Sequence, residues 1–128
     1  MSPLNTPEIS IEVIVNQIPD MEIQKPYQYF FSYQITILNR STQPVQLVSR
    51  YWLIMDGGLH EETVKGLGVV GQQPILEPNT SFTYTSGCPL MSEFGKMSGY
   101  YTFLNLNSQE TFQVEIPAFS LTTIFAQN

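Results

Sequence analysis

The stretch 28–37 reads QYFFSYQITI, and it decides the fold class more clearly than any other part of the chain. Its alternate positions are apolar or aromatic, whereas the positions between them are polar apart from Phe30. A period of two is typical of a β-strand with one buried face. We therefore expect a strand whose buried face is formed by Tyr29, Phe31, Tyr33, Ile35 and Ile37.

The same period of two recurs on both sides of this stretch. It predicts further strands near 9–15, 45–55, 61–65, 82–85, 97–103 and 112–116. Turn residues separate them at 39–42, 56–58, 78–80 and 105–109. No window shows a sustained helical period of 3.6, so about seven or eight short strands predict an antiparallel β-sandwich or barrel.

Two details of this prediction concern the edges and faces of strands. In the strand at 45–55, the alternation places one set of residues on one face and the intervening set on the other. The first set is Val45, Leu47, Tyr51, Leu53 and Met55, and the second is Gln46, Val48, Arg50, Trp52 and Ile54. We also expect residues 89–96 to form a loop and the apolar tail 116–121 to dock as an edge.

Composition and charge narrow the functional classes. The 128 residues carry five Lys+Arg against eleven Asp+Glu, a net charge of −6. The length suits one domain over 1–128, with flexible ends at 1–7 and 127–128. The scattered basic residues argue against nucleic-acid binding. No apolar run is long enough for membrane insertion, no signal peptide opens the chain, and the single Cys88 suits a reducing compartment, so we expect a cytoplasmic protein.

The segment 66–71 reads GLGVVG and matches the pattern G-x-G-x-x-G. In a dinucleotide-binding site this pattern opens a helix whose N-terminus faces a pyrophosphate. The residues that follow do not predict a helix, so that interpretation is disfavoured. Two alternatives stay open: a sharply turned strand in which glycines relieve crowding, or a backbone nest for pyrophosphate on a β-scaffold, with Lys65 as a nearby cation.

Candidate catalytic and metal-binding groups are few. His60 is the only histidine, and it lies close in sequence to Asp56, Glu61 and Glu62. Cys88 has no basic neighbour in sequence that would lower the pKa of its thiol. We therefore expect no metal, no cofactor and no catalytic residue, and hence a protein that is not an enzyme. A phosphohydrolase that uses a divalent ion at this acidic loop is the weakest alternative.

Arg50 and Trp52 form a second candidate site on the strand at 45–55. Arg and Trp are enriched among the anchors of protein interfaces, and an Arg can stack on an indole. The competing interpretation is a Trp in the core, covered by the aliphatic stem of the Arg. The sequence does not choose between them.

Several stretches together resemble the ApaG domain family. They are 39–41 (NRS), 45–54 (VQLVSRYWLI), 66–74 (GLGVVGQQP), 84–90 (YTSGCPL), 95–101 (GKMSGYY) and 116–121 (IPAFSL). The resemblance implies an all-β, immunoglobulin/fibronectin type III-like antiparallel β-sandwich. It also implies an association with cobalt resistance and magnesium efflux, and a domain that binds protein partners. The chain departs from the family pattern at Pro78-Asn79 and in the loop 55–60, which leaves the fold expectation intact.

Our leading hypothesis is a non-enzymatic, ApaG-like module for protein–protein interaction, indirectly associated with cobalt and magnesium tolerance. Its candidate contact residues for an unidentified protein partner are Arg50, Trp52, Gln73 and Pro74. The alternative is a site for pyrophosphate or a nucleotide, formed by Gly66, Gly68, Gly71 and Lys65. The many aromatic residues add a homodimer as a further expectation.

Overall fold

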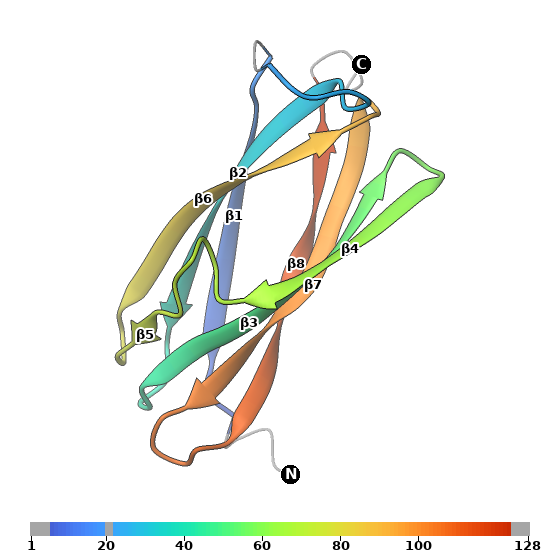
Figure 1. Ribbon diagram of the computed structural model, residues 1–128. Coiled ribbons are helices and arrows are strands. Elements are labelled where there is room, and N and C mark those ends of the chain that lie inside the picture. Colours follow the sequence, from blue (N-terminus) through green and yellow to red (C-terminus); the bar gives the residue numbers. More distant parts are fainter. Residues whose placement is uncertain (1–5, 20–21, 124–128) are drawn as a thin grey trace.

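The computed structural model describes residues 6–19 and 22–123, and all regular structure among them is β (Figure 1). The eight strands are β1 (Ile9–Gln17), β2 (Tyr29–Asn39), β3 (Val45–Asp56), β4 (His60–Leu67), β5 (Ile75–Leu76), β6 (Ser81–Leu90), β7 (Phe94–Asn105) and β8 (Thr111–Thr122). The predicted flexibility of 1–7 and 127–128 falls mostly outside the described residues. No helix in the described part of the chain has the length and apolar character to span a membrane.

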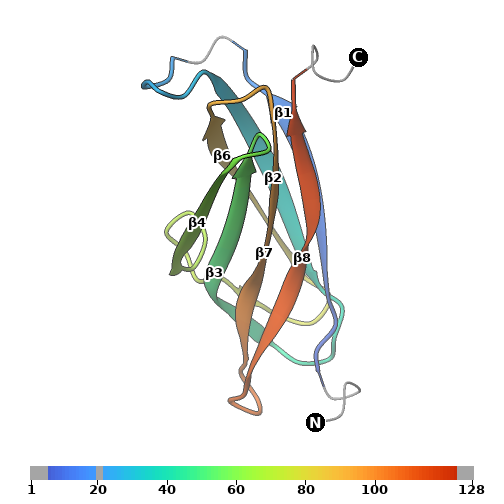
Figure 2. The same cartoon turned by 90° about the vertical axis from the view of Figure 1, so that its right-hand side faces the viewer.

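The strands form two antiparallel sheets that stack face to face (Figure 2). The smaller sheet has the order β1-β2-β6. The larger sheet has the order β4-β3-β7-β8, and β5 pairs with β3 beside β4. The predicted antiparallel β-sandwich is therefore confirmed, and its core lies between the two sheets.

Strand β2 supplies the centre of that core, as its alternation predicts. Phe31, Ile35 and Ile37 are fully buried, and Tyr33 is 5% exposed. Tyr29 at the start of the strand is half-buried and packs against the same cluster. The opposite positions of β2 are polar apart from Phe30 and Leu38, and none of them is buried. The buried face of this strand was therefore predictable from the period of two.

Strand β3 departs from the predicted alternation because Val48 forms a β-bulge. The register against β7 shifts between Leu47 and Ser49, where β3 carries one extra residue. Val45 and Leu47 are buried before the bulge, whereas Trp52 and Ile54 are buried after it. The prediction that one continuous face holds the apolar residues of this strand was therefore wrong. The remaining apolar residues of the predicted face, Tyr51, Leu53 and Met55, lie on the outer side of the sheet.

The C-terminal half is more regular than predicted. Residues 111–122 form one strand, β8, which lies at the edge of the larger sheet and pairs with β7 on both sides of a bulge at 117–118. The tail 116–121 is thus a continuation of a strand. The predicted loop 89–96 shrinks to three residues, because β6 runs to Leu90 and β7 begins at Phe94.

Candidate functional site

The bulge at Val48 directs Trp52 into the core. Trp52 is 3% exposed and lies edge-on to the rings of Tyr33, Tyr101 and Phe119, with centroid distances of 5.6, 6.4 and 5.9 Å. Edge-to-face packing of this kind is favoured between aromatic rings. The expectation that Trp52 is exposed at a partner surface was wrong, and the alternative of a core tryptophan is correct.

Arg50 follows the bulge on the same inner side and fastens the glycine-rich segment that leaves β4. Its Nη1 donates hydrogen bonds to the carbonyl oxygens of Leu67, at 3.1 Å, and Gly68, at 3.0 Å. A Cβ on Gly66 would lie only 2.7 Å from that Nη1 atom. Gly66 therefore makes room for the guanidinium group, which acts as a clamp on the segment.

The other two glycines of the motif form a tight hairpin. Val69 and Gln72 exchange two backbone hydrogen bonds of 2.8 Å, with Val70 and Gly71 between them. Val70 has φ 42° and Gly71 has φ 79°, which are the left-handed values of a type I′ turn. A Cβ on Gly68 would collide with the carbonyl oxygen of Gln72. Each glycine is thus explained by local structure. This agrees with the interpretation of 66–71 as a sharply turned strand.

Three of the backbone amides that a pyrophosphate nest could use are already engaged in hydrogen bonds. Gly68 donates its amide to the carbonyl of Val48, and the amides of Val69 and Gln72 are consumed within the hairpin. A nest binds an anion through successive N–H groups that point into one hollow. No helix follows the motif in the described residues, so the dinucleotide interpretation has no helix N-terminus either. The geometry therefore offers no support for the predicted pyrophosphate site at Gly66, Gly68 and Gly71.

Lys65 lies on the outer face of the larger sheet, opposite Tyr51. Its Nζ is 5.7 Å from the centroid of the Tyr51 ring, which itself stacks on Tyr100 at 5.1 Å. Arg50 lies on the inner face of β3, on the same side as the buried Trp52, and its guanidinium covers Gly66. The structure therefore directs the two cations to opposite faces of the larger sheet.

The segment 66–76 carries an exposed apolar surface that sequence reasoning missed. Leu67 is 73% exposed, Val70 51% and Ile75 55%. Hydrogen bonds hold the segment against β3: Gln73 Nε2 donates to the carbonyl of Val48 at 2.8 Å, and Leu47 donates its amide to Pro74 at 3.0 Å. Val70 is a β-branched residue with positive φ, an arrangement that costs free energy. In the sequence, the apolar doublet Val69-Val70 directly before Gly71 could have indicated an apolar residue exposed at a turn.

The acidic loop does not assemble a metal site. Asp56 is 5% exposed, and its two carboxylate oxygens accept the amides of Met91, at 2.8 Å, and Ser92, at 3.0 Å. Asp56 therefore ties the β3–β4 hairpin to the turn before β7. Within residues 6–19 and 22–123, no three His, Cys, Asp or Glu side chains lie close enough to hold an ion.

Cys88 is buried in the core and is a poor nucleophile. Burial, together with smaller contributions from the carboxylates of Asp56 and Glu62, raises the pKa of its thiol to about 12. A thiol with that pKa is protonated at neutral pH, whereas only the thiolate attacks. The expectation that this residue is not catalytic therefore has a physical basis in its surroundings.

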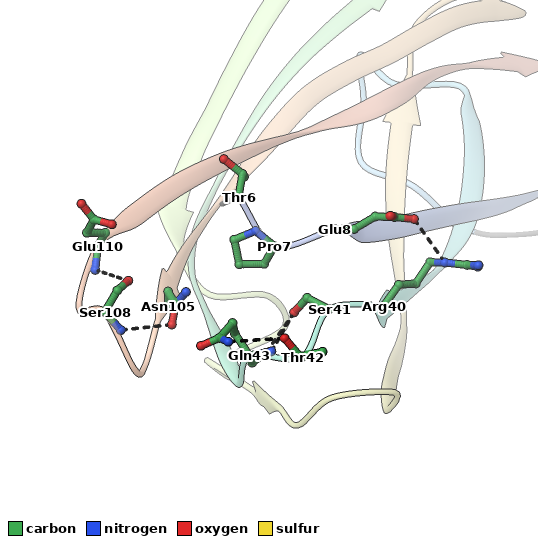
Figure 3. Close-up of a pocket in the computed structure, with 10 residues that line it drawn as sticks. All are labelled: Thr6, Pro7, Glu8, Arg40, Ser41, Thr42, Gln43, Asn105, Ser108 and Glu110. Carbon is green, nitrogen blue, oxygen red and sulfur yellow. Dashed lines mark hydrogen bonds and ion pairs between the residues drawn. The ribbon is translucent and has the colours of Figure 1, made fainter. Parts of the chain in front are cut away.

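A polar hollow of about 800 Å³ lies where the start of β1 meets the β2–β3 and β7–β8 turns (Figure 3). Its side chains are largely engaged with one another and with the turns. Arg40 pairs with Glu8 at 3.3 Å, and the amide of Ser108 donates to Asn105 Oδ1 at 3.2 Å. These contacts indicate that the lining residues organise the turns.

The fold and this site define an immunoglobulin/fibronectin type III-like β-sandwich with a clamped, surface-exposed glycine hairpin. Residues 19–105 match the ApaG domain family (DUF525). The chain is 52% identical over 94 residues to Protein ApaG of Methylorubrum extorquens, which covers 73% of this chain and 72% of the relative. It is 48% identical over 116 residues to Protein ApaG of Mesorhizobium japonicum, covering 91% and 88%. The chain therefore belongs to the ApaG domain family.

Solved structures agree with this assignment. The putative ApaA protein from Bordetella pertussis superposes with a TM-score of 0.85 at 39% identity, over 92% of this chain and 95% of that chain. A protein from Archaeoglobus fulgidus superposes with a TM-score of 0.51 at 10% identity, over 92% and 98% of the two chains. At that identity the likeness concerns the fold alone.

Proposed function

We propose that this chain is a non-enzymatic binding module of the cytoplasm, and that the segment 66–76 is the surface on which it binds a protein partner. The observation that carries the proposal is the exposed, clamped trio of apolar side chains Leu67, Val70 and Ile75. Rigid apolar side chains that stay exposed on a small domain are typical of interaction sites, because they lose little conformational entropy on binding.

The proposal revises the residues of the predicted contact surface. Gln73 has an exposed side chain within the segment, and Pro74 lies beside it half-buried. Arg50 serves as a positioning residue, since its guanidinium holds the carbonyls of Leu67 and Gly68 from the inner side. Trp52 contributes to the core and is left out of the surface.

The test compares two exposed apolar residues on different loops. Val70→Asp places a charge at the hairpin tip, and Asp tolerates positive φ better than Val does. Leu59→Asp is the matched control, because Leu59 is fully exposed in the β3–β4 loop. Both variants and the wild type are immobilised, and proteins captured from cell extract are quantified by mass spectrometry. We expect Val70→Asp alone to lose a partner; equal capture by all three would overturn the proposal.

We also propose that any role in cobalt or magnesium tolerance is exerted through that partner. Growth of cells that carry each variant is then measured against rising Co²⁺ and Mg²⁺. Greater metal sensitivity of cells with Val70→Asp, but not of cells with Leu59→Asp, supports the proposal. If neither substitution changes metal sensitivity, metal tolerance does not depend on this surface.

A further inference from the structure

Strand β4 is an open edge of the larger sheet (Figure 2). Among the described residues it pairs with β3 on one side only, and six of its eight residues are exposed. An open edge presents a row of N–H and C=O groups that can pair with another strand. The register with β3 shows which residues provide them, because Gly68 donates its amide to Val48 and the pairing continues without a break along β4. The backbone N–H and C=O groups of the even positions of β4 therefore point toward β3, and those of the odd positions point outward.

The charges along β4 are self-complementary about Thr63. When two copies of β4 pair antiparallel with a two-fold axis at Thr63, Glu61 of each copy lies opposite Lys65 of the other. All three are odd positions, so the outward N–H and C=O groups meet as hydrogen-bonded pairs. Opposite charges placed directly across two strands stabilise the pairing, and symmetry provides the interaction twice.

Neighbouring registers lack this complementarity. An axis at Glu62 places Glu62 opposite itself, and an axis at Lys65 places two lysines together. Like charges directly opposite destabilise a strand pair. An axis at Val64 pairs no opposite charges at all. On the inner face of the Thr63 register, Glu62 lies opposite Val64 and His60 opposite Gly66, so no like charges meet there.

We propose that β4 is the interface through which two copies of this chain associate in solution, with Thr63 on the two-fold axis. The two larger sheets then continue into one another across the dimer. The interface overlaps the proposed partner surface only at Gly66 and Leu67, the last two residues of β4. The substitutions that test the dimer lie at 61, 63 and 65, outside that surface, so the two proposals can fail separately.

Charge reversal provides the test, read by sedimentation velocity over a range of concentrations. Wild-type protein is expected to form a concentration-dependent dimer. Lys65→Glu and Glu61→Lys each put like charges opposite one another twice. Each variant alone is therefore expected to dimerise at least about ten-fold more weakly than the wild type. Mixed in equal amounts, the two variants again oppose Lys and Glu, and a heterodimer is expected. Circular dichroism checks that both variants are folded.

Two further variants separate pairing from side-chain loss. Lys65→Gln removes the cation over the Tyr51 ring without adding repulsion, so it is expected to weaken the dimer less than Lys65→Glu does. Thr63→Pro removes an outward N–H and is expected to block the dimer, whereas Thr63→Ala retains it. A wild-type protein that stays monomeric up to about 1 mM would overturn the proposal. So would a mixture of the charge-reversal variants that stays monomeric.

Discussion

Asn39 shows how a single buried side chain joins several turns. It is fully buried, and its Nδ2 donates to the carbonyls of Gln43, at 2.7 Å, and Leu76, at 2.9 Å. Its Oδ1 accepts both the amide and the hydroxyl of Ser41, at 2.9 and 2.7 Å. One side-chain amide thus provides hydrogen-bond partners for backbone groups of both the β2–β3 turn and the end of β5. Sequence reasoning identified the turn at 39–42 but not this second connection.

Replacing Asn39 with Ala should be costly, because it leaves buried carbonyl and N–H groups without partners. We expect Asn39→Ala to lower the free energy of unfolding by about 3 kcal/mol. Asn107→Ala is the control, since the side-chain hydrogen bond of Asn107 to Gln43 is exposed, and its loss should cost less than about 0.5 kcal/mol. Urea denaturation followed by circular dichroism measures both; equal costs would contradict the assigned role.

Trp52 provides a second prediction about a single residue. Removing an indole that packs on three rings leaves a large cavity, so Trp52→Ala should cost about 3–5 kcal/mol. Leu59→Ala, at a fully exposed position, should change stability by less than about 0.5 kcal/mol. Denaturation curves by circular dichroism give both values. If Trp52→Ala does not fold, Trp52→Phe serves instead and should still be less stable than wild type.

The hairpin at 68–72, between β4 and β5, is held by several hydrogen bonds although it is neither a strand nor a helix. Backbone hydrogen bonds close it, and Arg50 and Gln73 hold it from two sides. The bulge at Val48 is part of the same arrangement, because its carbonyl accepts both Gly68 N–H and Gln73 Nε2. The segment and the bulge therefore depend on one another, and neither is visible in the alternation of β3.

The two positive-φ glycines of this element should respond differently to substitution. Gly68→Ala forces a Cβ into the Gln72 carbonyl and should lower the free energy of unfolding by about 3 kcal/mol. Gly71→Asn should cost less than about 1 kcal/mol, because no atom lies within 4 Å of its Cβ position and Asn tolerates φ 79°. Hydrogen exchange at the Val69 amide should accelerate only in Gly68→Ala. Equal effects would show that the hairpin is looser than described.

At the scale of the whole molecule, the core contains a polar centre between the two sheets. The hydroxyls of Tyr84 on β6 and Tyr101 on β7 share a hydrogen bond of 2.6 Å. Burial raises the pKa values of Tyr33, Tyr84 and Tyr101 above their ordinary value of 10.0, and the Arg50 charge only partly opposes it. These phenols keep their protons as long as the sandwich is closed.

This centre predicts loss of stability in alkali. An unfolded chain releases these protons near pH 10, whereas the folded chain retains them, so their contribution is fully present below pH 10 and is lost as the pH rises above it. Urea unfolding between about pH 9 and pH 12 should show the decline. The double variant Tyr84→Phe, Tyr101→Phe removes both hydroxyls together and should show a shallower decline. An equally steep decline would contradict the explanation.

The sequence by itself determined the fold class and the core of β2, because a period of two places alternate side chains on opposite faces of any strand. It also suggested a sharp turn at 66–71 as one of two alternatives, since positive φ is available to glycine at little cost. The inward direction of Trp52 and Arg50 was decided only by the tertiary structure. One extra residue at Val48 exchanges the two faces of β3, and only pairing with β7 locates that bulge. The open edge of β4 likewise depends on which strands become neighbours, and local patterns do not encode that order.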